Sequence, residues 1–172
     1  MDNITSLRLF WPESVLTVAV LAMFIQDLIV RRSPRRELVL TIAALFWLGV
    51  TAAALAITPE GNVPLFGGLI QHDPLRVFFD WLFIAAALLT VLIVPKSAQI
   101  SAARMGEFIA LLFALVLGMF LMASATDLLM VYLAIETVSL VSYVLTSFRR
   151  ADRKANEAAL ATALPAKMKG SS

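Results

Sequence analysis

Residues 127–148 read DLLMVYLAIETVSLVSYVLTSF, a stretch that is apolar around most of a helix and carries one carboxyl group near its middle. A helix of this length is about 33 Å long, enough to cross a hydrocarbon core of about 30 Å. Its apolar residues do not alternate with polar ones as they would in a strand of a transmembrane barrel. The stretch therefore predicts a membrane-spanning helix.

Four further stretches of the chain have the same length and character. The five predicted spans are residues 12–30, 37–58, 76–94, 107–125 and 127–148. Helices are the expected spanning form, because every backbone N–H and C=O group must find a partner inside lipid. We expect an all-α membrane protein, with a transmembrane helical region over residues 1–148 and a basic cytoplasmic tail over residues 149–172.

The composition points away from soluble enzymes and from nucleic-acid binding. Of 172 residues, 60% are hydrophobic and 15% charged, and the mean hydropathy is +0.88. The chain has no cysteine and a single histidine, His72, which leaves no residues for a thiolate, haem or zinc centre. A glycine-rich phosphate loop is also absent, and the basic residues form short clusters between spans. We expect no cofactor, no metal and no nucleic acid on this chain.

The basic clusters predict how the spans are oriented, because short cytoplasmic loops carry excess Lys and Arg. They follow the first, third and fifth spans, at Arg31, Arg32, Arg35, Arg36, Lys96, Arg104, Arg149, Arg150, Arg153 and Lys154. The opposite side has only Arg8 and Arg76. We therefore expect an outward N-terminus, with the turn at residues 124–127 on the same outer side. Residues 59–75, rich in Gly and Pro, should form an outer loop or a short hairpin.

Glu136 is the main candidate functional residue, because it lies near the centre of the fifth span. An ionisable side chain at that depth costs about 2.5 kcal/mol or more, so it normally faces a bundle interior or cavity on a proton or ion path. Tyr132, Ser139 and Tyr143 share its helical face and form a polar stripe with it. Burial favours a neutral carboxyl and a nearby cation favours a charged one, so this group is suited to proton transfer. The simpler alternative is a neutral acid in one interhelical hydrogen bond.

The other acids near span ends have simpler interpretations. Asp27 and Asp80 lie within about a turn of span ends, where water and head groups should reach them, and Asp27 should pair with the arginine cluster that follows it. Glu107 begins the fourth span, where the positive end of the helix dipole favours a carboxylate. It remains a secondary candidate for a proton path. In the same span, the small residues Ala110, Ala114 and Gly118 predict the close approach of another helix.

A family resemblance adds to this interpretation. Residues 106–150, GEFIALLFALVLGMFLMASATDLLMVYLAIETVSLVSYVLTSFRR, resemble the proton-pumping subunit N family of bacterial NADH:quinone oxidoreductase, or complex I, whose mitochondrial counterpart is subunit 2. The match continues into KANEAAL, and DPLRVFFDWLF at 73–83 and Trp-Pro-Glu at 11–13 look similar too. The resemblance implies a fold of about fourteen helices with inverted repeats, each containing a broken helix.

The resemblance also implies roles and partners. Glu136 matches the family's span-five glutamate, which pairs with a lysine on a later helix and gates proton movement. From their positions in the sequence rather than from the resemblance, Tyr132, Ser139, Tyr143 and Glu107 are candidates to support it. NADH, FMN, the iron-sulfur clusters and quinone would bind other subunits of the complex. The expected location is the bacterial inner membrane, in contact with lipid and with other membrane subunits.

Two alternatives remain open at this stage. One is a subunit of an Mrp-type cation/proton antiporter, and the other is a non-catalytic membrane scaffold. After about residue 160 the chain reads ATALPAKMKGSS, whereas the family would continue into an apolar sixth helix. We expect a truncated, frame-shifted or split reading here, and an isolated fragment that is inactive.

Overall fold

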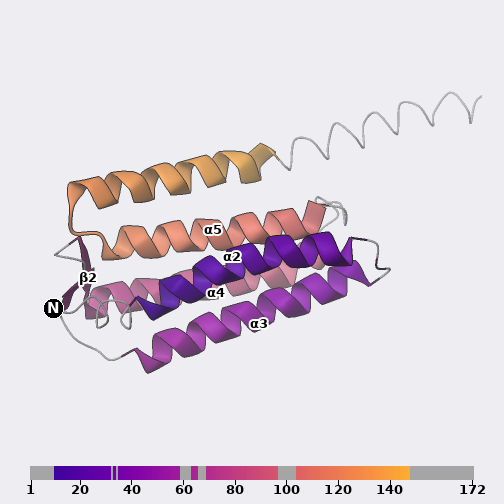
Figure 1. Cartoon of the computed structure of the whole chain (residues 1–172), viewed down its shortest axis with the longest axis horizontal. Coiled ribbons are helices and arrows are strands. Elements are labelled where there is room, and N and C mark those ends of the chain that lie inside the picture. The colour runs from indigo at the N-terminus through magenta and orange to yellow at the C-terminus, as the bar shows by residue number, and fades with distance from the viewer. Residues whose placement is uncertain are drawn as a thin grey trace, which may run out of the picture.

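The computed structural model describes residues 10–31, 33, 35–58, 63–65, 69–96 and 104–147. Five helices in these ranges are long and apolar enough to cross a membrane: α2 (Trp11–Val30), α3 (Arg36–Ile57), α4 (Pro74–Ile93), α5 (Met105–Ser124) and Leu128–Ser147. We call the last one the Glu136 helix; it has no label in Figure 1 and is drawn there in orange. The predicted class, an all-α membrane protein with five helices, is confirmed, and each helix end lies within two residues of the predicted span.

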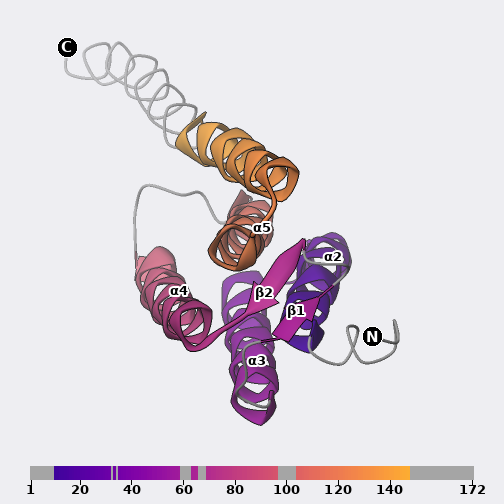
Figure 2. The same cartoon turned by 90° about the vertical axis from the view of Figure 1, so that its left-hand side faces the viewer.

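Helices α2 to α5 form a bundle, and the Glu136 helix lies beside it. Helix α5 packs against α2 and α4, and α3 closes the other side by packing against both. The end view in Figure 2 shows the Glu136 helix beyond α5, away from α3. The bundle core is fully buried and includes Leu16, Leu40, Val91, Phe113 and Phe120.

Local sequence signals define where the helices begin and end. Helices α2 and α4 each have a proline in the first turn, where the missing N–H costs no hydrogen bond. Asp73 caps α4, because its side chain accepts the backbone N–H of Arg76 at 2.8 Å. After α4 the chain tightens into the short 3₁₀ helix η2 (Val94–Lys96), whose proline cannot continue an α-helix.

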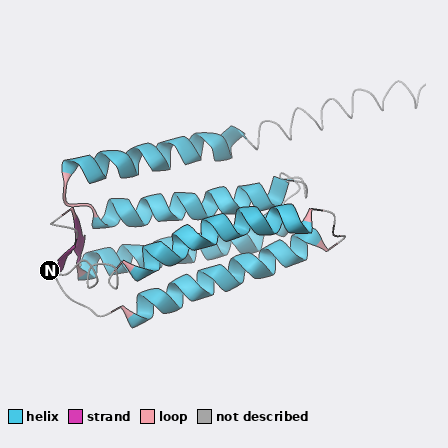
Figure 3. Cartoon of the chain, viewed as in Figure 1, coloured by secondary structure: helices cyan, strands magenta, loops and turns pink. Residues whose placement is uncertain are grey.

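The outer surface suits a lipid environment. Large apolar side chains are exposed along α2, α3, α4 and the Glu136 helix, among them Leu28, Ile42, Leu89 and Leu129. Several serine and threonine hydroxyl groups do not need water, because they donate to backbone carbonyls four residues earlier, as Thr90 does to Ala86 at 2.8 Å. Figure 3 shows how much of the described chain is helical. Such a surface would be a liability in water and is expected in a bilayer.

A two-stranded hairpin closes one end of the bundle. Strands β1 (Val63–Leu65) and β2 (Ile70–His72) are antiparallel, with Val63 opposite His72. The predicted short hairpin within residues 59–75 is therefore present. Ile70 also forms a bridge to Ala125, and the Thr126 N–H donates to the Leu69 carbonyl at 3.2 Å. The hairpin and the turn at residues 124–127 thus share one end of the bundle, which we call the hairpin end.

Candidate functional site

Glu136 lies in the middle part of its helix, as the sequence predicts. It is about 12 Å from the start of a helix about 30 Å long. The helix begins after Asp127, whose side chain accepts the Leu129 N–H at 2.8 Å and so starts the first turn. The only fully buried residue on the helix is Ala134, which is 1% exposed.

The polar stripe faces away from the bundle, contrary to the expectation that Glu136 faces the interior. Glu136 is exposed, Tyr132 and Tyr143 are 64% and 74% exposed, and Ser139 is half-buried. The helix packs by its opposite side, since a Cβ atom placed on Gly118 would lie only 2.9 Å from Val138 Cγ2. Residues 134 and 138 are each about 200° around the helix from Glu136. The close contact at Gly118 thus turns the stripe outward.

This contact confirms one prediction and corrects another. The row of small residues on α5 does admit a neighbouring helix, at Gly118. Glu136 does not lie in the interior of the five described helices. Helical spacing identifies residues that share a face, but it does not say which face packs against a neighbour.

Glu107 is on α5, whereas the stripe is on the Glu136 helix. It is exposed in the first turn of α5, at the end of the bundle away from the hairpin, where it can interact with the helix dipole. The stripe begins at Tyr132 near the hairpin end, because the Glu136 helix runs antiparallel to α5 (Figure 1).

Asp27 pairs with the arginine cluster as predicted, but it is buried rather than open to water. Arg36 Nη2 lies 2.5 Å from Asp27 Oδ1, and the two side chains are 10% and 9% exposed. The pair joins α2 to α3. A Cβ atom on Gly106 would collide with Asp27, so α5 approaches the pair closely as well. This explains the exclusion of water and gives the pair a packing role.

The sequence reasoning missed a second buried ion cluster. Glu13 in the first turn of α2 accepts a hydrogen bond from Arg76 of α4, and Arg76 Nε lies 3.3 Å from Asp80 Oδ2. All three side chains are 0% exposed. This burial contradicts the expectation that Asp80 meets water or head groups, and Arg76, at the outer end of the predicted span 76–94, is buried as well. The expectation for Asp80 is wrong, because α5 packs against α4 and the Glu13 side chain of α2 reaches Arg76 beside it.

One signal for this cluster was present in the sequence. Arg76 and Asp80 are four residues apart on one helical face, which is the spacing of an intrahelical ion pair. The partner on α2 is a contact between residues far apart in the chain, and no periodicity within one helix shows such a contact.

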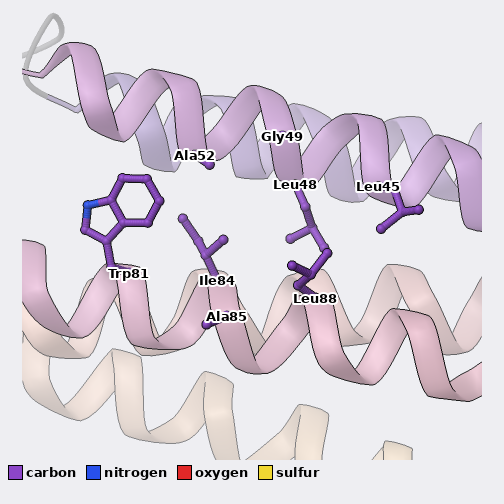
Figure 4. A pocket seen from close by; sticks show the side chains of 8 residues that line it. All are labelled: Leu45, Leu48, Gly49, Ala52, Trp81, Ile84, Ala85 and Leu88. Carbon is purple, nitrogen blue, oxygen red and sulfur yellow. The ribbon is translucent and has the colours of Figure 1, made fainter.

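A groove of about 280 Å³ runs between α3 and α4 and is lined by hydrophobic and small residues without ionisable side chains. Figure 4 shows Trp81 at one end and Ile84 and Leu88 along one wall, with Leu48 facing them from α3. Gly49 leaves space in the opposite wall.

Within the described ranges no three His, Asp or Glu residues are grouped as a metal site. The side chain of His72 and the predicted basic tail at 149–172 lie outside the described residues.

Comparisons with known proteins find similarity to subunits of NADH-quinone oxidoreductase. Residues 125–169 match the family model described as NADH:quinone oxidoreductase/Mrp antiporter, TM. The chain is 50% identical over 159 residues to NADH-quinone oxidoreductase subunit N of Anaeromyxobacter sp. (strain Fw109-5), covering 92% of this chain and 31% of that protein.

Two more distant relatives are similar over nearly the whole of this chain. NADH-quinone oxidoreductase subunit N 2 of Chloroherpeton thalassium is 34% identical, with 91% of this chain and 31% of that protein covered. NAD(P)H-quinone oxidoreductase subunit 2 of Synechococcus sp. (strain JA-3-3Ab) is 33% identical, with 87% and 28% covered. The chain spans about a third of the length of the curated relatives that it matches.

Proposed function

We propose that this chain, which is similar to subunit N of NADH-quinone oxidoreductase over most of its own length, is part of a proton-translocating subunit of that complex. The complete subunit would couple electron transfer from NADH to quinone with proton pumping. The observation that carries this proposal is the 50% identity over 159 residues, in a chain with a glutamate at mid-membrane depth. The protein acts in this account as a translocase subunit, and the isolated chain is inactive.

Glu136 transfers the proton. Its carboxyl group is exposed on the outward face of a spanning helix, where contact with lipid alone would cost about 2.5 kcal/mol or more. A further helix of the complete subunit covers this face and brings a lysine to Glu136, so that the protonation states of the two groups depend on each other. Quinone reduction elsewhere in the complex changes the charge along the membrane and thereby drives proton uptake and release.

Neighbouring residues on the stripe support this role. Tyr132 and Tyr143 are on the same exposed face and can hydrogen-bond to water or to the covering helix. Ser139 lies between Glu136 and Tyr143 in the chain and is half-buried. Glu107 is the weakest of these candidates, because it lies at the start of α5 rather than on the Glu136 helix.

The remaining assignments follow from the same homology. This chain binds no cofactor, and NADH, FMN, iron-sulfur clusters and quinone are bound by other subunits of the complex. Its partners are lipid and the other membrane subunits. It lies in the bacterial inner membrane with its N-terminus and the hairpin end outside, because the basic clusters are on the other side.

The test is Glu136→Gln in the assembled complex, measured as NADH-driven proton pumping per complex. The matched control is Glu37→Gln, the same substitution at an exposed site in the first turn of α3. We expect Glu136→Gln to abolish pumping through this subunit at normal complex abundance, with the control unchanged. Full pumping by Glu136→Gln would refute the role of this residue.

Two other results would favour the alternatives. A fall in complex abundance with unchanged pumping per complex would indicate a scaffold. Sodium or potassium transport that needs neither NADH nor quinone would indicate an Mrp-type antiporter, which the description of the matched family model also names.

A further inference from the structure

The formal charges of the Glu13–Arg76–Asp80 cluster do not balance. Two carboxyl groups face one guanidinium group, and all three side chains are 0% exposed. With every group ionised, the cluster would hold one uncompensated negative charge inside the bundle. Such a charge is strongly unfavourable, because no solvent stabilises it.

Three carboxylate oxygens in the cluster receive no hydrogen bond from the residues that the structure describes. Neither Glu13 Oε2 nor Asp80 Oδ1 and Oδ2 accepts a hydrogen bond from any residue in the described part of the chain. Buried hydrogen-bond acceptors normally have a donor, and these oxygens have none among the described residues. Protonation of one carboxyl oxygen supplies a donor, since it converts that oxygen from an acceptor into an O–H group.

Other charged groups on the surrounding helices are too far away or already engaged. Asp27, Arg36, Glu37 and Glu107 lie at the opposite end of the bundle. At the hairpin end, Asp73 is engaged in capping α4 through the backbone N–H of Arg76. No second cation among the described residues therefore balances the cluster.

We propose that the Glu13–Arg76–Asp80 cluster is a proton-binding site that holds one proton, on Asp80. Glu13 has the direct hydrogen bond from the guanidinium and remains a carboxylate. Asp80 meets Arg76 only at 3.3 Å through Nε, without hydrogen-bond geometry, and its Oδ1 has no partner in the described chain. Neither Glu136 nor the pumping of protons enters this inference.

The chemistry is a reversible protonation without electron transfer. Uptake forms one O–H bond on Asp80 and changes the formal charge of the cluster from −1 to 0. Because both carboxyl groups compete for one guanidinium, their titrations are coupled. If α2 moves away from α4, Arg76 loses its contact with Glu13 and pairs with Asp80. Asp80 then becomes a carboxylate, and its proton passes to Glu13 or to water.

Infrared spectroscopy of the full chain in its membrane assembly tests the proposal by counting protonated carboxyl groups through their carbonyl stretching bands. Asp80→Asn should lose one such band relative to the wild type. Glu13→Gln should lose it too, although Asp80 is still present, because Arg76 then pairs with Asp80. Arg76→Gln should gain one band, since both carboxyl groups become protonated.

The matched control is Asp27→Asn, which removes a carboxyl group that is paired one-to-one with Arg36 at the other end of the bundle. This variant should lose no band. A wild-type band that persists in both Asp80→Asn and Glu13→Gln would overturn the proposal, because the cluster would then be fully ionised. If Asp80→Asn fails to assemble, the loss or retention of the band in Glu13→Gln decides alone.

Discussion

Replacing Gly118 by alanine tests the contact that turns the polar stripe outward. The added methyl group would lie 2.9 Å from Val138 Cγ2 and 3.4 Å from Thr137 Cγ2, closer than normal packing for the first contact. Forcing an extra methyl group into a packed contact costs about 1–3 kcal/mol. The matched control is Gly49→Ala, where a Cβ atom would meet nothing within 4 Å.

Both substitutions bring the same change in helix propensity, about 1 kcal/mol in favour of alanine. The difference between the two variants therefore isolates the steric cost. We expect Gly118→Ala to be about 1–3 kcal/mol less stable than Gly49→Ala in detergent unfolding titrations followed by circular dichroism. Adding Val138→Ala should recover most of the loss, because it removes the atom that clashes. Equal stability of the two alanine variants would refute the packing of the Glu136 helix on α5.

Three further predictions concern the ion pair and the helix cap. Asp27→Ala should lower the free energy of unfolding by about 3–5 kcal/mol, because it leaves Arg36 buried without its carboxylate, and the double replacement with Arg36→Met should recover much of it. An Asp27→Ala variant with the same free energy of unfolding as the wild type would contradict this expectation. Gly106→Ala should also destabilise the protein in the same unfolding assay, because the new methyl group collides with Asp27, and a neutral result would show that α5 lies farther away. Asp73→Ala should cost about 1 kcal/mol through the lost cap on Arg76, measured by the same titration, whereas an unchanged midpoint would mean that the cap is not formed.

Hydropathy and turn residues were enough to predict the helices. Lipid requires about 20 apolar residues per span, so the five segments stand out in the sequence. Gly118 correctly predicted a close helix contact. Helix α4 begins at Pro74, two residues before the predicted span, which started at residue 76. These features depend on short segments of the chain, which the sequence shows directly.

The rotation of the helices and their long-range contacts were not predictable in the same way. The stripe around Glu136 was identified, but its direction depends on which side of the helix fits against α5. The burial of Arg76 was not predicted, because its partner Glu13 lies 63 residues earlier in the chain. The burial of Asp80, which lies beside Arg76, likewise depends on contacts between helices and not on its own helix alone.

If Glu136 transfers protons, the face that carries it must contact protein or water in the assembled membrane protein rather than lipid. A photo-crosslinking side chain in place of Tyr132, followed by mass spectrometry of the adducts, measures this directly. The control is the same replacement at Leu89, which is 61% exposed on α4 and is expected to face lipid. We predict protein adducts at position 132 and lipid adducts at position 89, whereas lipid adducts at both positions would contradict a covered proton-transfer face.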